Sequence, residues 1–171
     1  MQKIFENWKR FVNENALSKP TVKLYHYCGR YCPGDPGSVV LEPQMGADAP
    51  QSYSRRDYDV LQVPRIWFYL DPADRESSVT GPLYSVEVPT SQIYNLREDE
   101  RDFIGEIQRE RQKEKYFYGT VKQPLRKGED WNNLFYLIID KGYKGVYYKT
   151  RFDVVVWLEP IEVTLEKKEE K

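Results

Sequence analysis

Apolar and polar positions along the chain repeat with two different periods. Short apolar or alternating runs predict six strands, at 22–27, 65–70, 83–88, 146–149, 154–158 and 161–165. Apolar residues at helical spacing predict three amphipathic helices, at 3–16, 99–112 and 130–141. Gly142 is expected to end the third helix, because glycine is common just past a helix C-terminus. Strands with a few interposed helices predict an α+β fold.

The stretch 28–62 departs from both periods. It is rich in Gly, Pro, Asp and Ser, and its strongest turn signal lies at 33–37. A stretch of that length without regular structure is uncommon inside a compact domain and is usually functional. We therefore expect a long functional loop between the first two strands.

The length of 171 residues suits one domain with a single core. We expect residues 1–20 to form a helical extension, 21–165 to form the domain, and 166–171 to be a charged tail. Lys plus Arg number 26 against 27 Asp plus Glu, which leaves a net charge of −1. That balance argues against a global basic field for non-specific nucleic-acid binding.

The chain contains neither an apolar run of about 18 residues nor a signal-peptide pattern, so no membrane association is expected. Its two cysteines, Cys28 and Cys32, are then expected to be reduced thiols in the cytoplasm. Together with His26 and Asp35 they place four potential metal ligands in one segment. Structural zinc normally uses two separate ligand clusters, and only one is present, so we expect no metal. We expect a monomer.

Three residues that could take part in catalysis or ligand binding lie on predicted strands. His26, the only histidine, lies in the run 23–27, and Tyr69 lies in the apolar run 66–70. Asp153 opens the late apolar run 154–158. Each also has an ordinary structural interpretation, as an exposed histidine, a core aromatic or a carboxylate that caps a strand edge.

The order of these residues resembles that of the functional residues in ADP-ribosyltransferases of the His-Tyr-Glu type. The run 24–26 resembles the first-strand motif of that family, and 67–70 resembles the strand with the nicotinamide-stacking aromatic. The segments 141–147 and 152–161 resemble the Gly-aromatic-x-Gly-Val entry and the late strand that opens on the catalytic acid. This chain has Asp153 where the family usually has the longer Glu. The resemblance covers roughly residues 22–163 and implies a split, mostly antiparallel β core with a few flanking helices.

The resemblance implies that ADP-ribose is transferred from NAD to a macromolecular acceptor, protein or nucleic acid, with release of nicotinamide. His26, beside Tyr25, would hold the ribose, Tyr69 would stack on nicotinamide, and Asp153 would orient the ribose. In such a reaction the site must mainly hold the oxocarbenium-like ribose and stabilise its positive charge. Acid–base catalysis is less important. Guanidinium groups suit a diphosphate, so one of three arginines is expected to contact it: Arg55, Arg56 or Arg65.

Two other functions remain open. One is a related activity of the same fold, an NAD glycohydrolase or an RNA 2′-phosphotransferase. The other is a non-catalytic binding module or phage accessory protein. The segment 5–11 resembles the N-termini of bacteriophage-encoded proteins, which would place the protein in the cytoplasm of a host cell.

Overall fold

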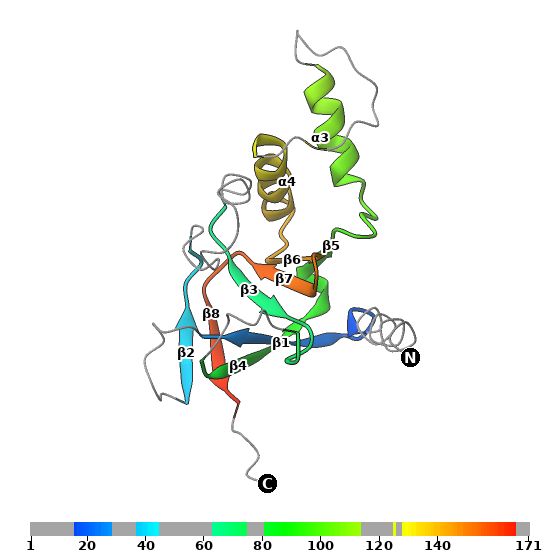
Figure 1. Cartoon of the computed structure of the whole chain (residues 1–171). Helices are drawn as coiled ribbons and strands as arrows, with labels where there is room; N and C mark the ends of the chain where they lie inside the picture. Colours follow the sequence, from blue (N-terminus) through cyan, green and yellow to red (C-terminus); the bar gives the residue numbers. More distant parts are fainter. Residues whose placement is uncertain are drawn as a thin grey trace.

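The computed structural model describes residues 16–28, 37–44, 63–74, 81–113, 125 and 128–166. Within these residues the chain forms one eight-stranded sheet and two α-helices (Figure 1). The elements are β1 Thr21–Tyr27, β2 Ser38–Leu41, β3 Ile66–Tyr69, β4 Leu83–Pro89, a 3-10 turn Thr90–Gln92, β5 Ile93–Asn95, α3 Phe103–Gln112, α4 Glu129–Asp140, β6 Gly145–Lys149, β7 Asp153–Trp157 and β8 Ile161–Leu165.

The strand order across the sheet is β2-β8-β4-β1-β3-β7-β6-β5. Neighbouring strands are antiparallel except β5 and β6, which are parallel. This arrangement confirms the predicted α+β class with a mostly antiparallel sheet. The pairing is uneven, because β1 pairs with β4 at seven positions from Thr21 to Tyr27 but with β3 only at Tyr25. The sheet is therefore weakly joined between β1 and β3.

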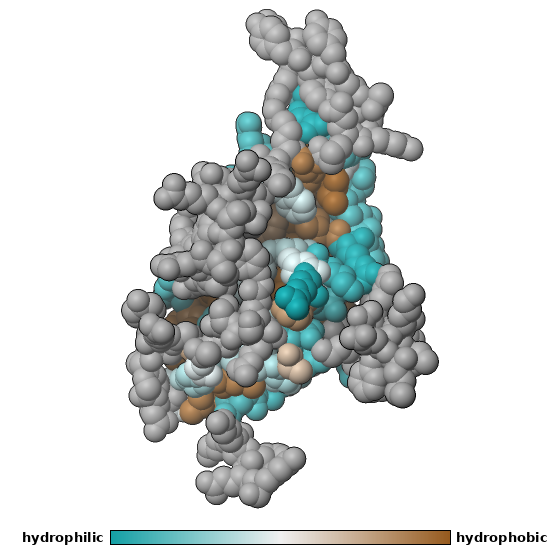
Figure 2. All heavy atoms as spheres, in the orientation of Figure 1, coloured by the Kyte–Doolittle hydropathy of each residue, from teal (hydrophilic) through white to brown (hydrophobic). Residues whose placement is uncertain are grey.

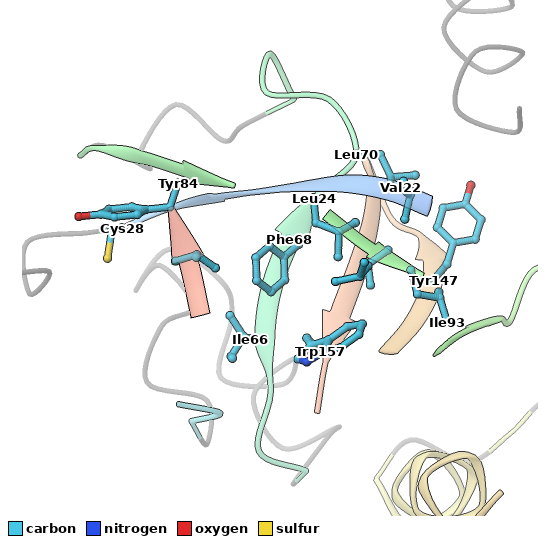
Figure 3. Close-up of a cluster of buried hydrophobic side chains, with 13 residues drawn as sticks. Val22, Leu24, Cys28, Ile66, Phe68, Leu70, Tyr84, Ile93, Tyr147 and Trp157 are labelled. Carbon is cyan, nitrogen blue, oxygen red and sulfur yellow. The ribbon is translucent and has the colours of Figure 1, made fainter. Parts of the chain in front are cut away.

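One face of the sheet encloses the first of two buried clusters (Figure 3). Its members come from almost the whole sheet, including Leu24 of β1, Phe68 of β3, Ile93 of the edge strand β5 and Val163 of β8. Val39 of the opposite edge strand β2 packs against the same cluster. Because residues from both edges reach one cluster, the sheet must curve around it. Removing this apolar surface from water is the main stabilising contribution to such a core.

The second cluster lies between the other face of the sheet and the helices. Alternation along β7 directs Val155 and Trp157 to the first cluster and Val156 to the second. Leu134, Phe135 and Ile138 of α4 pack into this second cluster. The helices thus cover the β5-β6-β7-β3 half of the sheet (Figure 1). Apolar residues also reach the surface over α4, where Ile139 is exposed (Figure 2).

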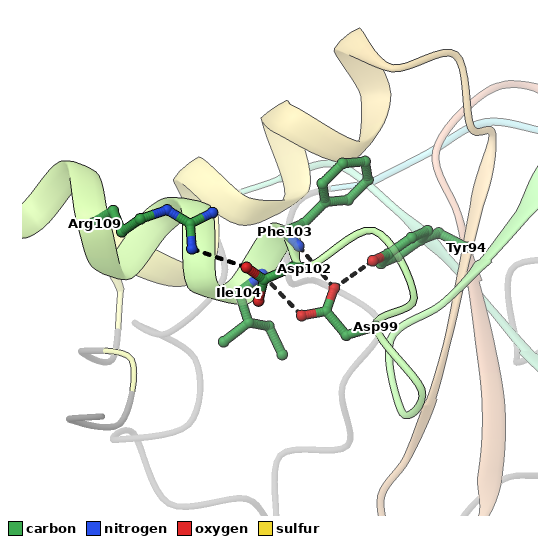
Figure 4. Close-up of polar contacts among 6 residues, drawn as sticks. All are labelled: Tyr94, Asp99, Asp102, Phe103, Ile104 and Arg109. Atoms are coloured by element: carbon green, nitrogen blue, oxygen red, sulfur yellow. Dashed lines mark hydrogen bonds and ion pairs between the residues drawn. The ribbon is translucent and has the colours of Figure 1, made fainter. Parts of the chain in front are cut away.

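Helix α3 begins four residues later than predicted because Asp99 caps it (Figure 4). The Asp99 carboxylate accepts hydrogen bonds from the backbone N–H groups of Phe103 (2.9 Å) and Ile104 (3.1 Å), and from the Tyr94 hydroxyl. Asp99 and Asp102 both have positive φ, so the backbone before the helix is not helical. These bonds satisfy N–H groups that a helix N-terminus otherwise leaves unpaired.

All six predicted strands are present, and the predicted helix 130–141 corresponds to α4. Gly142 follows α4 with φ of 91°, which confirms its expected role at the helix end. Two strands were missed: β2, inside the stretch expected to be a loop, and the three-residue β5. The predicted helix 3–16 falls almost entirely outside the described residues. None of the helices described here is long and apolar enough to cross a membrane.

A buried ion pair joins the end of α3 to the start of α4. The Arg111 guanidinium donates to the Asp130 carboxylate at 2.7 Å, and the two side chains are 4% and 2% exposed. Asp130 lies in the first turn of α4, where the helix dipole favours a carboxylate. Each charge depends on its partner, because an uncompensated buried charge is very unfavourable.

Replacing Arg111 with Met should therefore lower the free energy of unfolding by about 3–5 kcal/mol, measured by urea denaturation. The matched control is Lys113→Met, which breaks an exposed pair with Glu110 and should cost at most about 1 kcal/mol. Replacing both partners, as in Arg111→Met with Asp130→Leu, should recover much of the loss. Equal effects of the Arg111 and Lys113 variants would contradict a stabilising buried pair.

Candidate functional site

The three strands that carry His26, Tyr69 and Asp153 are direct neighbours in the sheet, in the order β1-β3-β7. Tyr69 lies opposite Tyr25 on one side and Val154 on the other. His26 follows Tyr25, and Asp153 precedes Val154. Each predicted residue is thus within one position of a single row across three strands. With strands about 4.8 Å apart and about 3.3 Å per residue, the His26 and Asp153 backbones are roughly 12 Å apart.

His26 lies where β1 and β3 separate. Its Nδ1 is 2.8 Å from the Trp67 carbonyl oxygen, and its ring centroid is 5.6 Å from that of Phe68. A carbonyl only accepts, so Nδ1 carries a proton and donates. When the ring is neutral, Nε2 is then its acceptor nitrogen. Opposite His26 on β4 is Tyr84, fully buried, with a hydroxyl that has no hydrogen-bond partner in the described structure. The half-buried imidazole is therefore held in a defined orientation.

Asp153 is 7% exposed and lies at the start of β7. Its carboxylate Oδ1 accepts a 2.8 Å hydrogen bond from the hydroxyl of Tyr147 on β6, which is 1% exposed. Burial raises the pKa of Tyr147 to about 12, with further contributions from the hydrogen bond to Asp153 and from its charge. Arg97 interacts with the same hydroxyl and lowers the Tyr147 pKa. The Asp153 carboxylate is thus buried beside a hydroxyl group that stays protonated.

Tyr69 belongs to the other face of the sheet. Phe68 is in the first cluster and Trp67 packs against the second, as strand alternation predicts. Tyr69 shares the face of Trp67, because it is opposite Tyr25 and Val154. Its ring makes edge contacts with Tyr27 (6.3 Å) and Phe152 (6.0 Å). The structure therefore brings His26 and Asp153 to one face of the sheet and places the Tyr69 side chain on the other.

Of the three arginines expected to contact a diphosphate, Arg65 lies within the described residues and Arg55 and Arg56 do not. The Arg65 guanidinium donates to the Val63 carbonyl at 3.1 Å and lies 5.7 Å from the centre of the Trp67 ring. Burial lowers the pKa of Arg65. Its side chain is thus packed on the second-cluster face, away from Asp153.

Tyr25, expected beside the ribose, faces away from the first cluster. It is opposite Ser85 on β4, and the Lys23 ammonium lies 5.5 Å from the centre of its ring. Lys23 also pairs with Glu166 at 2.5 Å. Tyr25 therefore lies within a charged outer surface of β1 and β4.

The expectation of reduced cysteines is wrong for Cys28, which is buried and disulfide-bonded. Cys32 and Asp35 fall outside the described residues. Among the residues that are described, no three His, Cys, Asp or Glu side chains converge as a metal site would require.

Sequence reasoning missed Tyr147 and Arg97 as partners of Asp153. The register of β6 against β7 places Tyr147 opposite Val155, on the same face as Asp153. Arg97 follows β5, whose Asn95 pairs with Tyr147. Both contacts depend on strand pairing, which no local sequence signal indicates.

A hollow of ≈ 200 Å³ lies at a different place, near the start of α3. Its lining includes Tyr94, Tyr143, Glu98 and Arg101, and none of His26, Tyr69 or Asp153. Tyr94 and Tyr143 are already engaged in edge and stacking contacts with each other and with Phe103. The hollow is open and its lining carries both charges. The end of the sheet with His26 and Asp153 is the stronger candidate for a functional site, because an imidazole and a buried carboxylate lie there on one face.

No protein-family model, curated protein or solved structure matches the chain. We therefore infer the function from the residues of the site themselves.

The raised pKa of Tyr147 predicts how stability depends on pH. An unfolded tyrosine ionises near pH 10, whereas Tyr147 in the folded protein ionises near 12. Between about pH 10 and 12 the unfolded state loses this proton first, so the free energy of unfolding should fall as pH rises. Tyr147→Phe should show a weaker decrease in urea denaturation series over that range. Tyr136→Phe, at a tyrosine that is 54% exposed, should retain the wild-type decrease. Identical pH dependence in all three proteins would contradict the raised pKa.

Proposed function

We propose that the protein transfers ADP-ribose from NAD to a macromolecular acceptor and releases nicotinamide. The single observation that carries this proposal is the adjacency of β1, β3 and β7, which collects His26, Tyr69 and Asp153 within one position of a common row. These residues are 127 positions apart in the chain from first to last, 153 minus 26. The adjacency of these three strands is what the resemblance to His-Tyr-Glu ADP-ribosyltransferases leads one to expect, although the Tyr69 side chain lies on the other face of the sheet.

The chemistry of the two residues on one face suits the ribose of NAD. As the bond to nicotinamide breaks, positive charge develops on the ribose, and a nearby carboxylate stabilises it. Asp153 would supply that charge, and its burial strengthens the effect because fewer water molecules screen it. The acceptor nitrogen of His26 would take a hydrogen bond from a ribose hydroxyl, since Nδ1 is engaged with Trp67.

Tyr69 is assigned to the nicotinamide ring, at the end of β3 and in contact with Phe152, the residue before Asp153. Its position on the opposite face means that nicotinamide would bind around the end of the sheet. The buried Tyr84 hydroxyl opposite His26 adds a polar group on the ribose side. We propose that NAD is the substrate of this reaction. We propose the cytoplasm as its location, which would be that of a host cell if the chain is phage-encoded.

The decisive experiment incubates the protein with NAD labelled in the adenylate part, together with a cell lysate. Label on protein or nucleic acid supports transfer, whereas free ADP-ribose without labelled macromolecule indicates a glycohydrolase. A parallel reaction with 2′-phosphorylated RNA tests for phosphotransfer. NAD that remains intact in all reactions would overturn the proposal and favour a non-catalytic binding protein, an interpretation consistent with the hydrogen bond that engages Asp153.

Asp153→Asn should reduce NAD turnover by about 100- to 1,000-fold, because the amide keeps the shape of the carboxylate but loses its charge. NAD affinity, measured by calorimetry, should change little. The variant should also lose about 1–2 kcal/mol of stability, because the carboxylate is buried and hydrogen-bonded.

Glu159→Gln is the control for this experiment, since Glu159 is exposed and pairs with Lys144 at 3.1 Å. It should retain wild-type turnover. If Asp153→Asn is fully active, Asp153 is not the catalytic acid. A variant that is destabilised but turns over NAD normally would assign Asp153 a structural role alone.

A further inference from the structure

A line of three polar side chains runs from the surface to Asp153. Arg97 is exposed on the connection between β5 and α3, and its side chain interacts with the Tyr147 hydroxyl, whose pKa it lowers. The Tyr147 hydroxyl in turn donates to Asp153 Oδ1 at 2.8 Å. The backbone reinforces this line, because Leu96 N–H donates to the Tyr147 carbonyl oxygen at 3.0 Å. Arg97 is thus fixed next to Tyr147 by the parallel pairing of β5 and β6.

The direction of the hydrogen bonds follows from the donors. The single hydroxyl proton of Tyr147 is directed to Asp153, and an arginine can only donate, so Arg97 can interact only with the lone pairs of the Tyr147 oxygen. An ionised carboxylate has only acceptor atoms, so it is the form of the Asp153 side chain that suits the hydroxyl proton donated by Tyr147. Burial of both side chains removes competing water, which strengthens the bond and restricts the rotation of the carboxylate.

We propose that Tyr147, supported by Arg97, is a positioning residue that holds the Asp153 carboxylate in its catalytic orientation. This inference rests on the proposed NAD chemistry. An aspartate side chain is short, so the direction of its carboxylate is set by χ1 and by its hydrogen-bond partners. Tyr147 belongs to the rigid first cluster, which makes it a firm support for that direction. Loss of its hydroxyl leaves the ring in place but removes one of the hydrogen bonds that orient the carboxylate.

The test compares Tyr147→Phe with Tyr148→Phe. Both variants lose one hydroxyl on β6, but Tyr148 lies on the other face, against Trp67 and Phe135. Tyr147→Phe should lower kcat for NAD consumption by about 10- to 100-fold with little change in KM, because misplacement of a reacting group affects the chemical step. Tyr148→Phe should leave kcat unchanged. Arg97→Met should give a smaller decrease in kcat than Tyr147→Phe.

A second measurement is independent of activity. With tyrosines labelled at the ring carbon that bears the hydroxyl, NMR titration should show Tyr147 ionising with a pKa of about 12 in the wild type. In Asp153→Asn that pKa should decrease but stay above the ordinary value of about 10, because the neighbouring charge is gone while burial, the larger cause, remains. An unchanged Tyr147 pKa would show that the two groups do not interact in solution and would overturn the inference.

The outcomes separate this inference from the proposed function. If Asp153→Asn is inactive and Tyr147→Phe is fully active, Tyr147 has no positioning role, and the proposed function stands. If the wild-type protein does not consume NAD, both fall, and the shifted Tyr147 pKa then reports a structural pair. If Tyr147→Phe and Tyr148→Phe lose kcat equally, the effect comes from general loosening of β6 and the inference is overturned.

Discussion

Burial of a single apolar cluster constrains almost every part of this fold. Phe68, Leu24 and Val155 lie at its centre without solvent exposure, and residues of both outermost strands reach it. A flat sheet of eight strands could not surround one cluster, so the sheet curves. The pairing is weakest between β1 and β3, which share one pair of residues in register. The curvature in turn leaves the opposite face of one half of the sheet for the helices and the second cluster.

The candidate site lies at the margin of that first cluster, so its polar groups are in contact with core residues. His26 is adjacent to Phe68, and Asp153 is bonded to Tyr147, so both polar groups adjoin the core residues. A carboxylate in such a place is unfavourable unless it is hydrogen-bonded, and Tyr147 meets this requirement. The same bond is compatible with a purely structural acid and with a catalytic acid held in one direction. Chemistry with NAD distinguishes the two roles, because only the second requires the charge of Asp153 for turnover.

Local patterns predicted the elements well where the apolar period was long. The alternating run 83–88 and the helical run 130–141 correspond closely to β4 and α4. The missed strands are short and lack a signal of their own: β2 lies among turn residues, and β5 has three residues. Both exist because β8 and β6 offer them backbone partners. The start of α3 was misplaced because Asp99, the first residue of the predicted helix 99–112, caps the helix from outside.

For the site, the amino-acid sequence by itself determined that His26, Tyr69 and Asp153 would lie on strands, because the apolar periods around them are local properties of the chain. It also determined that Phe68 and Tyr69 would face opposite ways, since side chains alternate along any strand. Only the tertiary structure decided which strands are neighbours, and hence that Asp153 meets Tyr147 while Tyr69 lies on the other face. Cys28 likewise proved to be disulfide-bonded, although the sequence suggested a free thiol. Strand order and register depend on how distant segments share one core, and that shared burial is a property of the whole chain.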